Sequence, residues 1–117
     1  MTAATAITPA QLPAVIRGYL AAHEAHDTDA ALAAFTPTAV VVDDGSTHRG
    51  TEEVRRFLWT AGAQFTYTTT LVSAGRCDDG QWVVTNRLEG DFPGGVVDLR
   101  YRFRLDAGLI AELVIAP

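Results

Sequence analysis

Apolar residues at helical spacing mark the first third of the chain. They recur three or four positions apart and share one face through about residue 24. These residues are Leu12, Val15, Ile16, Tyr19 and Leu20. The helix is expected to start at Thr8-Pro9-Ala10-Gln11, where Thr8 can cap, Pro9 needs no N–H, and Gln11 can close a capping box. The ring of Tyr19 is expected to face the core.

Two further helices and a short strand follow. The Asp27-Thr28-Asp29 cluster can cap a short helix that runs through Leu32 to Phe35, before Pro37 stops it. Ala39 to Val42 reads as a brief apolar strand that runs into the turn Asp43-Asp44-Gly45-Ser46. Gly50-Thr51-Glu52-Glu53 opens the third helix with acids at its positive end. The apolar face of that helix carries Val54, Phe57, Leu58 and Ala61.

After Gly62 the pattern changes to strands. Four are predicted, over residues 65–74, 81–91, 96–106 and 109–115. Short turns separate them at 77–80, 92–95 and 107–108. Residues 96–106 alternate cleanly between apolar and charged positions, which is typical of a sheet with one buried face. The order of elements excludes a doubly wound parallel sheet and predicts a single α+β domain over residues 1–117, with helices on one face of the sheet.

Composition and charge exclude several classes of partner and location. The 117 residues are 48% hydrophobic and 20% charged, as in a globular protein, and carry a net charge of −5. Arg100, Arg102 and Arg104 alternate with apolar residues as on the outer face of a strand, so we expect no nucleic-acid partner. The single cysteine, Cys77, gives neither an intramolecular disulfide nor a metal cluster. No signal peptide and no membrane span are recognisable, so a cytoplasmic location without membrane attachment is expected.

Several segments resemble the NTF2-like superfamily, and within it the SnoaL-like and ketosteroid isomerase-like proteins. The residues that carry the resemblance are Tyr19, the short helix ending at Phe35, the segment 36–43, the helix opening 50–54, and the run 99–106. The resemblance covers essentially the whole chain. It implies a cone in which three N-terminal helices pack on a curved, mixed but mainly antiparallel sheet. An apolar pocket lies between them, and a homodimer without cofactor or metal is expected.

The resemblance also implies a catalytic pair. Ketosteroid isomerases have a tyrosine in the first helix that donates to the substrate oxygen, and an aspartate at the end of the first strand that moves the proton. Tyr19 and Asp43 match these two positions, 24 residues apart (43 − 19). A carboxylate beside an apolar cavity is expected to have a raised pKa. The alternative is that Asp43 is a turn former and Tyr19 a core aromatic.

Tyr101 departs from the family pattern. Ketosteroid isomerases have a second, protonated aspartate in the long penultimate strand, and the matching position here is Tyr101. A tyrosine hydroxyl can also donate to an oxyanion, so the role could persist with different chemistry.

Other residues are expected to line the pocket. Asn86 is the lone polar residue on the more apolar face of its strand, so either a ligand or a hydrogen bond to Tyr19, Tyr101 or water would satisfy it. Trp59 could line the entrance or simply pack. The full set of expected ligand-binding residues is Phe57, Trp59, Val84, Asn86, Leu88 and Leu99.

Most of the remaining polar residues are interpreted as surface residues without a role in the pocket. Arg87, Glu89 and Asp91 fall on the outer face of their strand, which is expected to be solvated or to form a dimer. His23 and His26 are interpreted as surface histidines. His48 could reach the pocket rim as a general acid or be solvated.

Two functions remain open. One is a cofactor-independent isomerase or cyclase that acts on a small apolar carbonyl compound, steroid- or polyketide-like, by acid/base chemistry. The other is a non-catalytic ligand-binding or dimerisation module that uses the same pocket. The fold alone does not choose between them.

Overall fold

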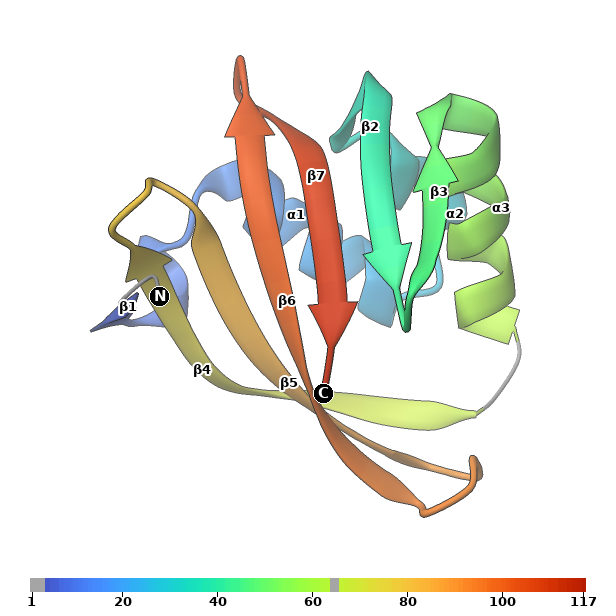
Figure 1. The fold of residues 1–117 in the computed structure, drawn as a ribbon. Helices are drawn as coiled ribbons and strands as arrows, with labels where there is room; N and C mark the ends of the chain where they lie inside the picture. The colour runs from blue at the N-terminus through green and yellow to red at the C-terminus, as the bar shows by residue number, and fades with distance from the viewer. Residues whose placement is uncertain (1–3, 64–65) are drawn as a thin grey trace.

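A seven-stranded sheet and three α-helices make up the fold (Figure 1). The computed structural model describes residues 4–63 and 66–117. The elements are β1 (Ala4–Ile7), the 3-10 helix η1 (Pro9–Gln11), α1 (Ala14–Glu24), α2 (Thr28–Leu32), β2 (Phe35–Asp43), β3 (Ser46–Arg49), α3 (Gly50–Ala63), β4 (Tyr67–Cys77), β5 (Trp82–Gly90), β6 (Val96–Asp106) and β7 (Leu109–Ala116). A strand was predicted to start at Phe65, which lies outside the described residues. Ala61 was predicted to be buried, and its side chain is likewise not described.

The sheet is mixed and mainly antiparallel. Its strand order is β1-β4-β5-β6-β7-β2-β3, and β2 pairs with β7 in the parallel direction while the other neighbours are antiparallel. The three predicted helices are present, and Figure 1 shows α1 and α2 behind the sheet and α3 beside β3. The edge strands β1 and β3 were not predicted, because each has only four residues and no apolar alternation.

Two predicted helix boundaries were wrong. The first helix begins at Ala14 rather than at Thr8, because Pro13 holds Leu12 extended and separates the η1 turn from α1. The backbone N–H of Thr8 still donates to Gln11 Oε1 at 2.8 Å. The second helix ends at Leu32, since Phe35 already pairs with Ile110 of β7 and belongs to β2.

The core lies between one face of the sheet and the helices. The predicted alternation of β6 is confirmed: Tyr101 and Phe103 are buried, whereas Arg100, Arg102 and Arg104 are exposed. Phe103 packs edge-on against Tyr19 of α1, with ring centroids 5.8 Å apart. This contact joins the helical face and the sheet face that the apolar pattern predicted.

The pairing between neighbouring strands is irregular at two places. The register of β4 against β5 shifts between Leu71 and Ser73, and that of β6 against β7 shifts between Arg104 and Leu105. Such shifts bend a strand and increase its twist. Figure 1 shows β4, β5 and β6 swinging across below the ends of β2 and β3.

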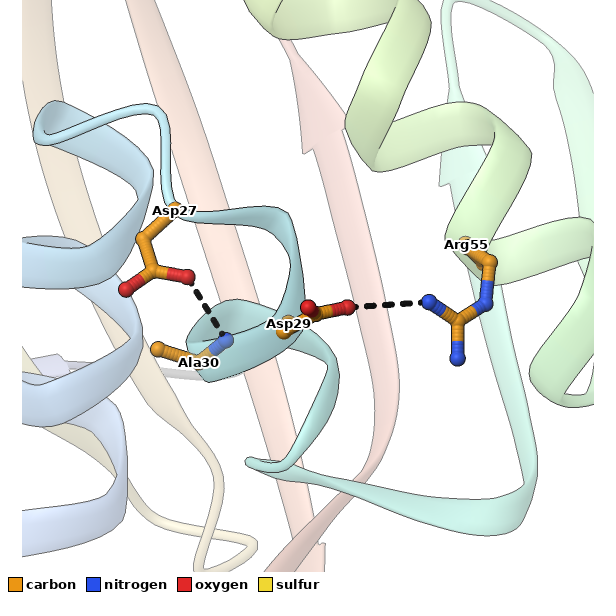
Figure 2. Close-up of polar contacts among 4 residues, drawn as sticks. All are labelled: Asp27, Asp29, Ala30 and Arg55. Atoms are coloured by element: carbon orange, nitrogen blue, oxygen red, sulfur yellow. Dashed lines mark hydrogen bonds and ion pairs between the residues drawn. The ribbon is translucent and has the colours of Figure 1, made fainter.

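Side chains of α2 position it against α3. The Asp27 carboxylate caps α2 by accepting from the backbone N–H of Ala30 at 3.1 Å, as the sequence predicted. Arg55 of α3 donates to Asp29 at 3.0 Å, and both side chains are largely exposed (Figure 2). The cap satisfies a helix N–H, while the ion pair is screened by solvent.

Asp27→Ala is expected to lower the free energy of unfolding by about 1 kcal/mol, because the first turn of α2 loses its cap. Arg55→Ala, which removes only the exposed ion pair, is expected to lower it by less than about 0.5 kcal/mol. Urea unfolding monitored by circular dichroism measures both. Equal losses in the two variants would contradict the assignment of Asp27 as the cap.

Candidate active site

A cavity of about 430 Å³ lies where the ends of β2 and β7 face the turn between β5 and β6. Most of its lining is apolar. The lining residues are His23, Asp43, Asp44, Phe57, Tyr67, Leu88, Phe92, Pro93, Val97, Leu99, Tyr101, Ile115, Ala116 and Pro117. A concave apolar site with a few polar groups is the usual form of a ligand pocket.

Asp43 is placed in this cavity by strand alternation and a tight turn. It follows the fully buried Val41 by two residues, so both side chains lie on the core face of β2. The chain then reverses at Asp44 and Gly45, both with positive φ, and Asp43 pairs with Ser46 of β3. This is the two-residue hairpin geometry that Asp-Gly favours. Asp43 therefore ends a strand on the core face and also precedes a turn.

The Asp43 carboxyl group is half-buried. Desolvation raises its pKa above the ordinary value of 3.8, the neighbouring Asp44 raises it further, and His48 lowers it. Among the described residues, no hydrogen bond to the Asp43 carboxylate is found that would offset the desolvation. The carboxylate is thus a stronger base than an exposed aspartate.

Tyr101 also lines the cavity, from β6. Burial first, then Tyr67 and Asp43, raise the pKa of its hydroxyl well above the ordinary value, and the neighbouring Asn86 side chain lowers it. Asn86 is buried as predicted, but it is not among the cavity-lining residues.

Tyr19 is completely buried behind the cavity wall. Its hydroxyl has no hydrogen-bond partner among the described residues. Burial raises its pKa well above the ordinary value, and Tyr101, Tyr67 and Asp43 add to this effect. A buried hydroxyl without a hydrogen-bond partner is rare and lowers the stability of the folded state. The position of this hydroxyl near Tyr101, Tyr67 and Asp43 therefore needs an explanation.

His23 and Tyr67 are cavity residues that the sequence did not predict. The Tyr67 hydroxyl lies 3.3 Å from His23 Nε2, and both residues line the cavity with Asp43. His23 is half-buried rather than on the surface, and desolvation, with a smaller effect of His26, lowers its pKa. His23 follows Tyr19 by one helical turn, which was the available signal for its direction. His26 is exposed, as predicted.

Besides Asn86, two of the predicted ligand-binding residues, Trp59 and Val84, do not line the cavity. Trp59 is 67% exposed and lines a separate hollow between α1, α2 and α3, because it lies off the buried stripe of α3. Val84 is fully buried beneath the cavity wall. His48 lies on β3, not in a loop, and its ring packs 5.0 Å from that of Phe57. Phe57, Leu88 and Leu99 line the cavity as predicted.

Arg87 and Glu89 are exposed on the outer face of β5, as the alternation indicated. Arg87 forms two hydrogen bonds with Asp98 of β6, at 2.8 and 3.1 Å. Asp91 accepts from the backbone N–H of Thr66 at 2.9 Å and so fixes the start of β4. These side chains support strand pairing outside the cavity.

Within the described ranges, no group of three or more His, Cys, Asp or Glu side chains is arranged to hold a metal ion. Across the same residues, none of the helices combines the length and apolar character needed to cross a bilayer.

Comparison with known proteins identifies relatives over nearly the whole chain. A family model described as a SnoaL-like domain matches residues 16–113. A proposed polyketide cyclase from Sinorhizobium meliloti is 32% identical, with a TM-score of 0.86 over 94% of this chain and 100% of that protein. No match was found among curated proteins.

More distant structures share the fold. A Catenulispora acidiphila protein with a ketosteroid isomerase-like fold, in complex with trimethylamine, is 18% identical, with a TM-score of 0.78 over 92% of this chain and 87% of that one. A Mycobacterium tuberculosis protein in complex with estradiol-17beta-hemisuccinate is 24% identical, with a TM-score of 0.75 over 92% of this chain and 95% of that one.

Asp43→Asn is expected to stabilise the protein at pH 7. The folded state raises the pKa of Asp43, so it binds the proton more tightly than the unfolded chain does. Wild-type stability should therefore fall as pH rises from 3.8 through the raised pKa, and asparagine, which cannot ionise, should abolish this part of the fall.

Melting temperatures of both proteins between pH 3 and pH 8 measure the effect. The exposed Asp78→Asn, in the turn between β4 and β5, is the matched control and should show no such divergence. A variant that is less stable than wild type by the same amount at every pH would show that the turn, and not desolvation, governs Asp43.

Proposed function

The chain belongs to the SnoaL-like domain family, and from that premise we propose that it is a cofactor-independent isomerase- or cyclase-type enzyme for a small apolar carbonyl compound. The observation that carries the proposal is the half-buried Asp43 carboxylate, with its raised pKa, on the wall of a mainly apolar cavity. A single carboxylate held against apolar surface is a typical arrangement for a general base.

In the proposed reaction, Asp43 removes a proton from the carbon beside the ligand's carbonyl. The electron pair of the broken C–H bond forms the enolate double bond, and the carbonyl oxygen takes the negative charge. The Tyr101 hydroxyl, on the cavity wall, donates a hydrogen bond to that oxygen, and the Tyr19 hydroxyl donates a second one when the ligand displaces the side chains that now cover Tyr19. In an isomerisation, the carboxylic acid of Asp43 then returns the proton to another carbon of the same molecule, so no cofactor is consumed.

Two features support these donor roles. The Tyr19 hydroxyl is without a partner among the described residues, and a ligand oxygen would satisfy it. The Asn86 side chain lowers the pKa of Tyr101, which is the effect of a donor to the phenol oxygen, and such a donor leaves the Tyr101 proton for a ligand. Both phenols have pKa values well above neutrality, so they are protonated donors at pH 7.

The relatives agree with a ligand of this class. The Sinorhizobium meliloti protein is named for a proposed polyketide cyclase activity, and the Mycobacterium tuberculosis protein binds a steroid ester within the same fold. We further propose that the sheet curves around the helices as the expected cone, so that its end closes over the ligand.

Proton abstraction is tested by deuterium exchange into 1-tetralone, a small bicyclic ketone, in D2O. Wild type is expected to accelerate exchange at the carbon beside the carbonyl, followed by mass spectrometry. Asp43→Asn should reduce the rate at least ~100-fold, because a general base typically contributes that much, while leaving tetralone binding within about threefold.

The surface substitution Asp78→Asn is the control and should exchange at the wild-type rate. Exchange that persists in Asp43→Asn would contradict the proposed base. Binding without exchange in wild type would favour the alternative, a ligand-binding module without catalysis.

Leu99→Trp is expected to weaken tetralone binding about tenfold or more, because the larger ring occupies the cavity that Leu99 lines. Arg100→Trp places the same ring on the exposed face of β6 and should leave the dissociation constant unchanged. Titration calorimetry measures both, and equal affinities in the two variants would place the ligand elsewhere.

A homodimer is proposed from the family and from the broad outer face of the sheet. Light scattering after size-exclusion chromatography should give twice the 12.5 kDa of one chain. A mass of one chain at micromolar concentration would contradict it.

A further inference from the structure

A second polar pair lies on the cavity wall. It consists of His23 of α1 and Tyr67 at the start of β4, whose side chains meet with 3.3 Å between Nε2 and the hydroxyl oxygen. Among the described residues, these are the polar side chains that line the cavity besides Asp43, Asp44 and Tyr101. Neither has a part in the proton transfer proposed above.

The pair and Asp43 come from distant parts of the sheet. In the strand order, β4 and β2 are separated by β5, β6 and β7, so four interstrand steps connect them. Along a flat sheet this would be roughly 19 Å, at about 4.8 Å a step. The start of β4 nevertheless swings below the end of β2 (Figure 1). One cavity is lined by both Tyr67 and Asp43. A ligand in the cavity can therefore meet polar groups that come from different parts of the sheet.

The pair is held in place by its neighbours. The Tyr19 ring stacks on His23 with centroids 5.9 Å apart and planes at 13°. The ring of His26 meets that of Tyr67 edge-on at 6.2 Å. Opposite Tyr67, Gly90 allows a close approach of β4, since a Cβ there would overlap the carbonyl oxygen of Thr66 and lie 2.6 Å from the Tyr67 Cβ. Such support is typical of residues that bind rather than merely fill space.

The chemistry of the pair selects one type of partner. If His23 Nε2 accepts the Tyr67 proton, the Tyr67 oxygen is left as an acceptor; if Nε2–H donates to that oxygen, the Tyr67 proton is directed elsewhere. A ligand hydroxyl is both donor and acceptor, so it complements either tautomer. A second carbonyl or an ether oxygen complements only one.

We propose that His23 and Tyr67 form a subsite for a hydroxyl group, so that the cavity selects an apolar hydroxyketone, with its carbonyl at Asp43 and its hydroxyl at Tyr67. This subsite rests on the proposed function, because it assumes that the carbonyl end lies at Asp43. Tyr67 binds the hydroxyl, and His23 is a positioning residue that orients Tyr67.

The test compares 1-tetralone with its 5-, 6- and 7-hydroxy derivatives, which place a hydroxyl at different positions on the ring away from the carbonyl. At least one hydroxy derivative should bind wild type about fivefold tighter than 1-tetralone, the gain expected from one added hydrogen bond. Tyr67→Phe should abolish this gain while leaving 1-tetralone binding within about twofold. His23→Gln should reduce the gain, and the exposed His26→Gln should retain it.

For each protein, the gain is the ratio of two dissociation constants, one for 1-tetralone and one for its hydroxy derivative. A general loss of stability in a variant affects both constants and therefore leaves their ratio unchanged. A gain that persists in Tyr67→Phe, or no gain for any isomer in a wild type that binds 1-tetralone, overturns the subsite and leaves the proposed function intact. Failure of wild type to bind 1-tetralone and all three derivatives overturns both.

Discussion

The structure depends on a mismatch between the inner face of the sheet and the helices that cover it. Where β5 and β6 lie under α1, their inward side chains are fully buried, as Val84 and Phe103 show. Further along the same strands, Leu88 and Leu99 are only partly buried and face the cavity instead. An apolar face without a covering helix is costly in water, so this end of the sheet is suited to an apolar ligand.

The same mismatch sets the electrostatics of the cavity. Side chains that reach it leave water without entering the close-packed core, and this raises the pKa of Asp43 and lowers that of His23. Deeper in, the Tyr19 hydroxyl has no hydrogen-bond partner among the described residues, and the polar side chain of Asn86 is buried next to Tyr101. A purely structural core would replace these groups with apolar ones of similar size, since buried polar groups do not add stability unless their hydrogen bonds are complete. Their concentration around one hollow is what distinguishes a site from a packing irregularity.

The two flanks of the cavity have different origins. Asp43 is fixed locally, because a strand on the core face ends in a turn that Asp44 and Gly45 dictate. Tyr67 and His23 are brought together by a contact between elements far apart in the chain, α1 and the start of β4.

The sequence by itself determined the class of fold, the three helices, the alternation of β5 and β6, and the inward direction of Leu99 and Tyr101. Each of these follows from local periodicity or turn chemistry, which neighbouring residues encode. The inward direction of Asp43 was instead implied by the match of Tyr19 and Asp43 to the ketosteroid isomerase pattern. Only the tertiary structure decided that Trp59 belongs to another surface, that β1 and β3 pair at the sheet edges, and that His23 meets Tyr67. Those facts depend on how far the sheet bends and on which helix covers which strand, and no spacing along the chain records either quantity.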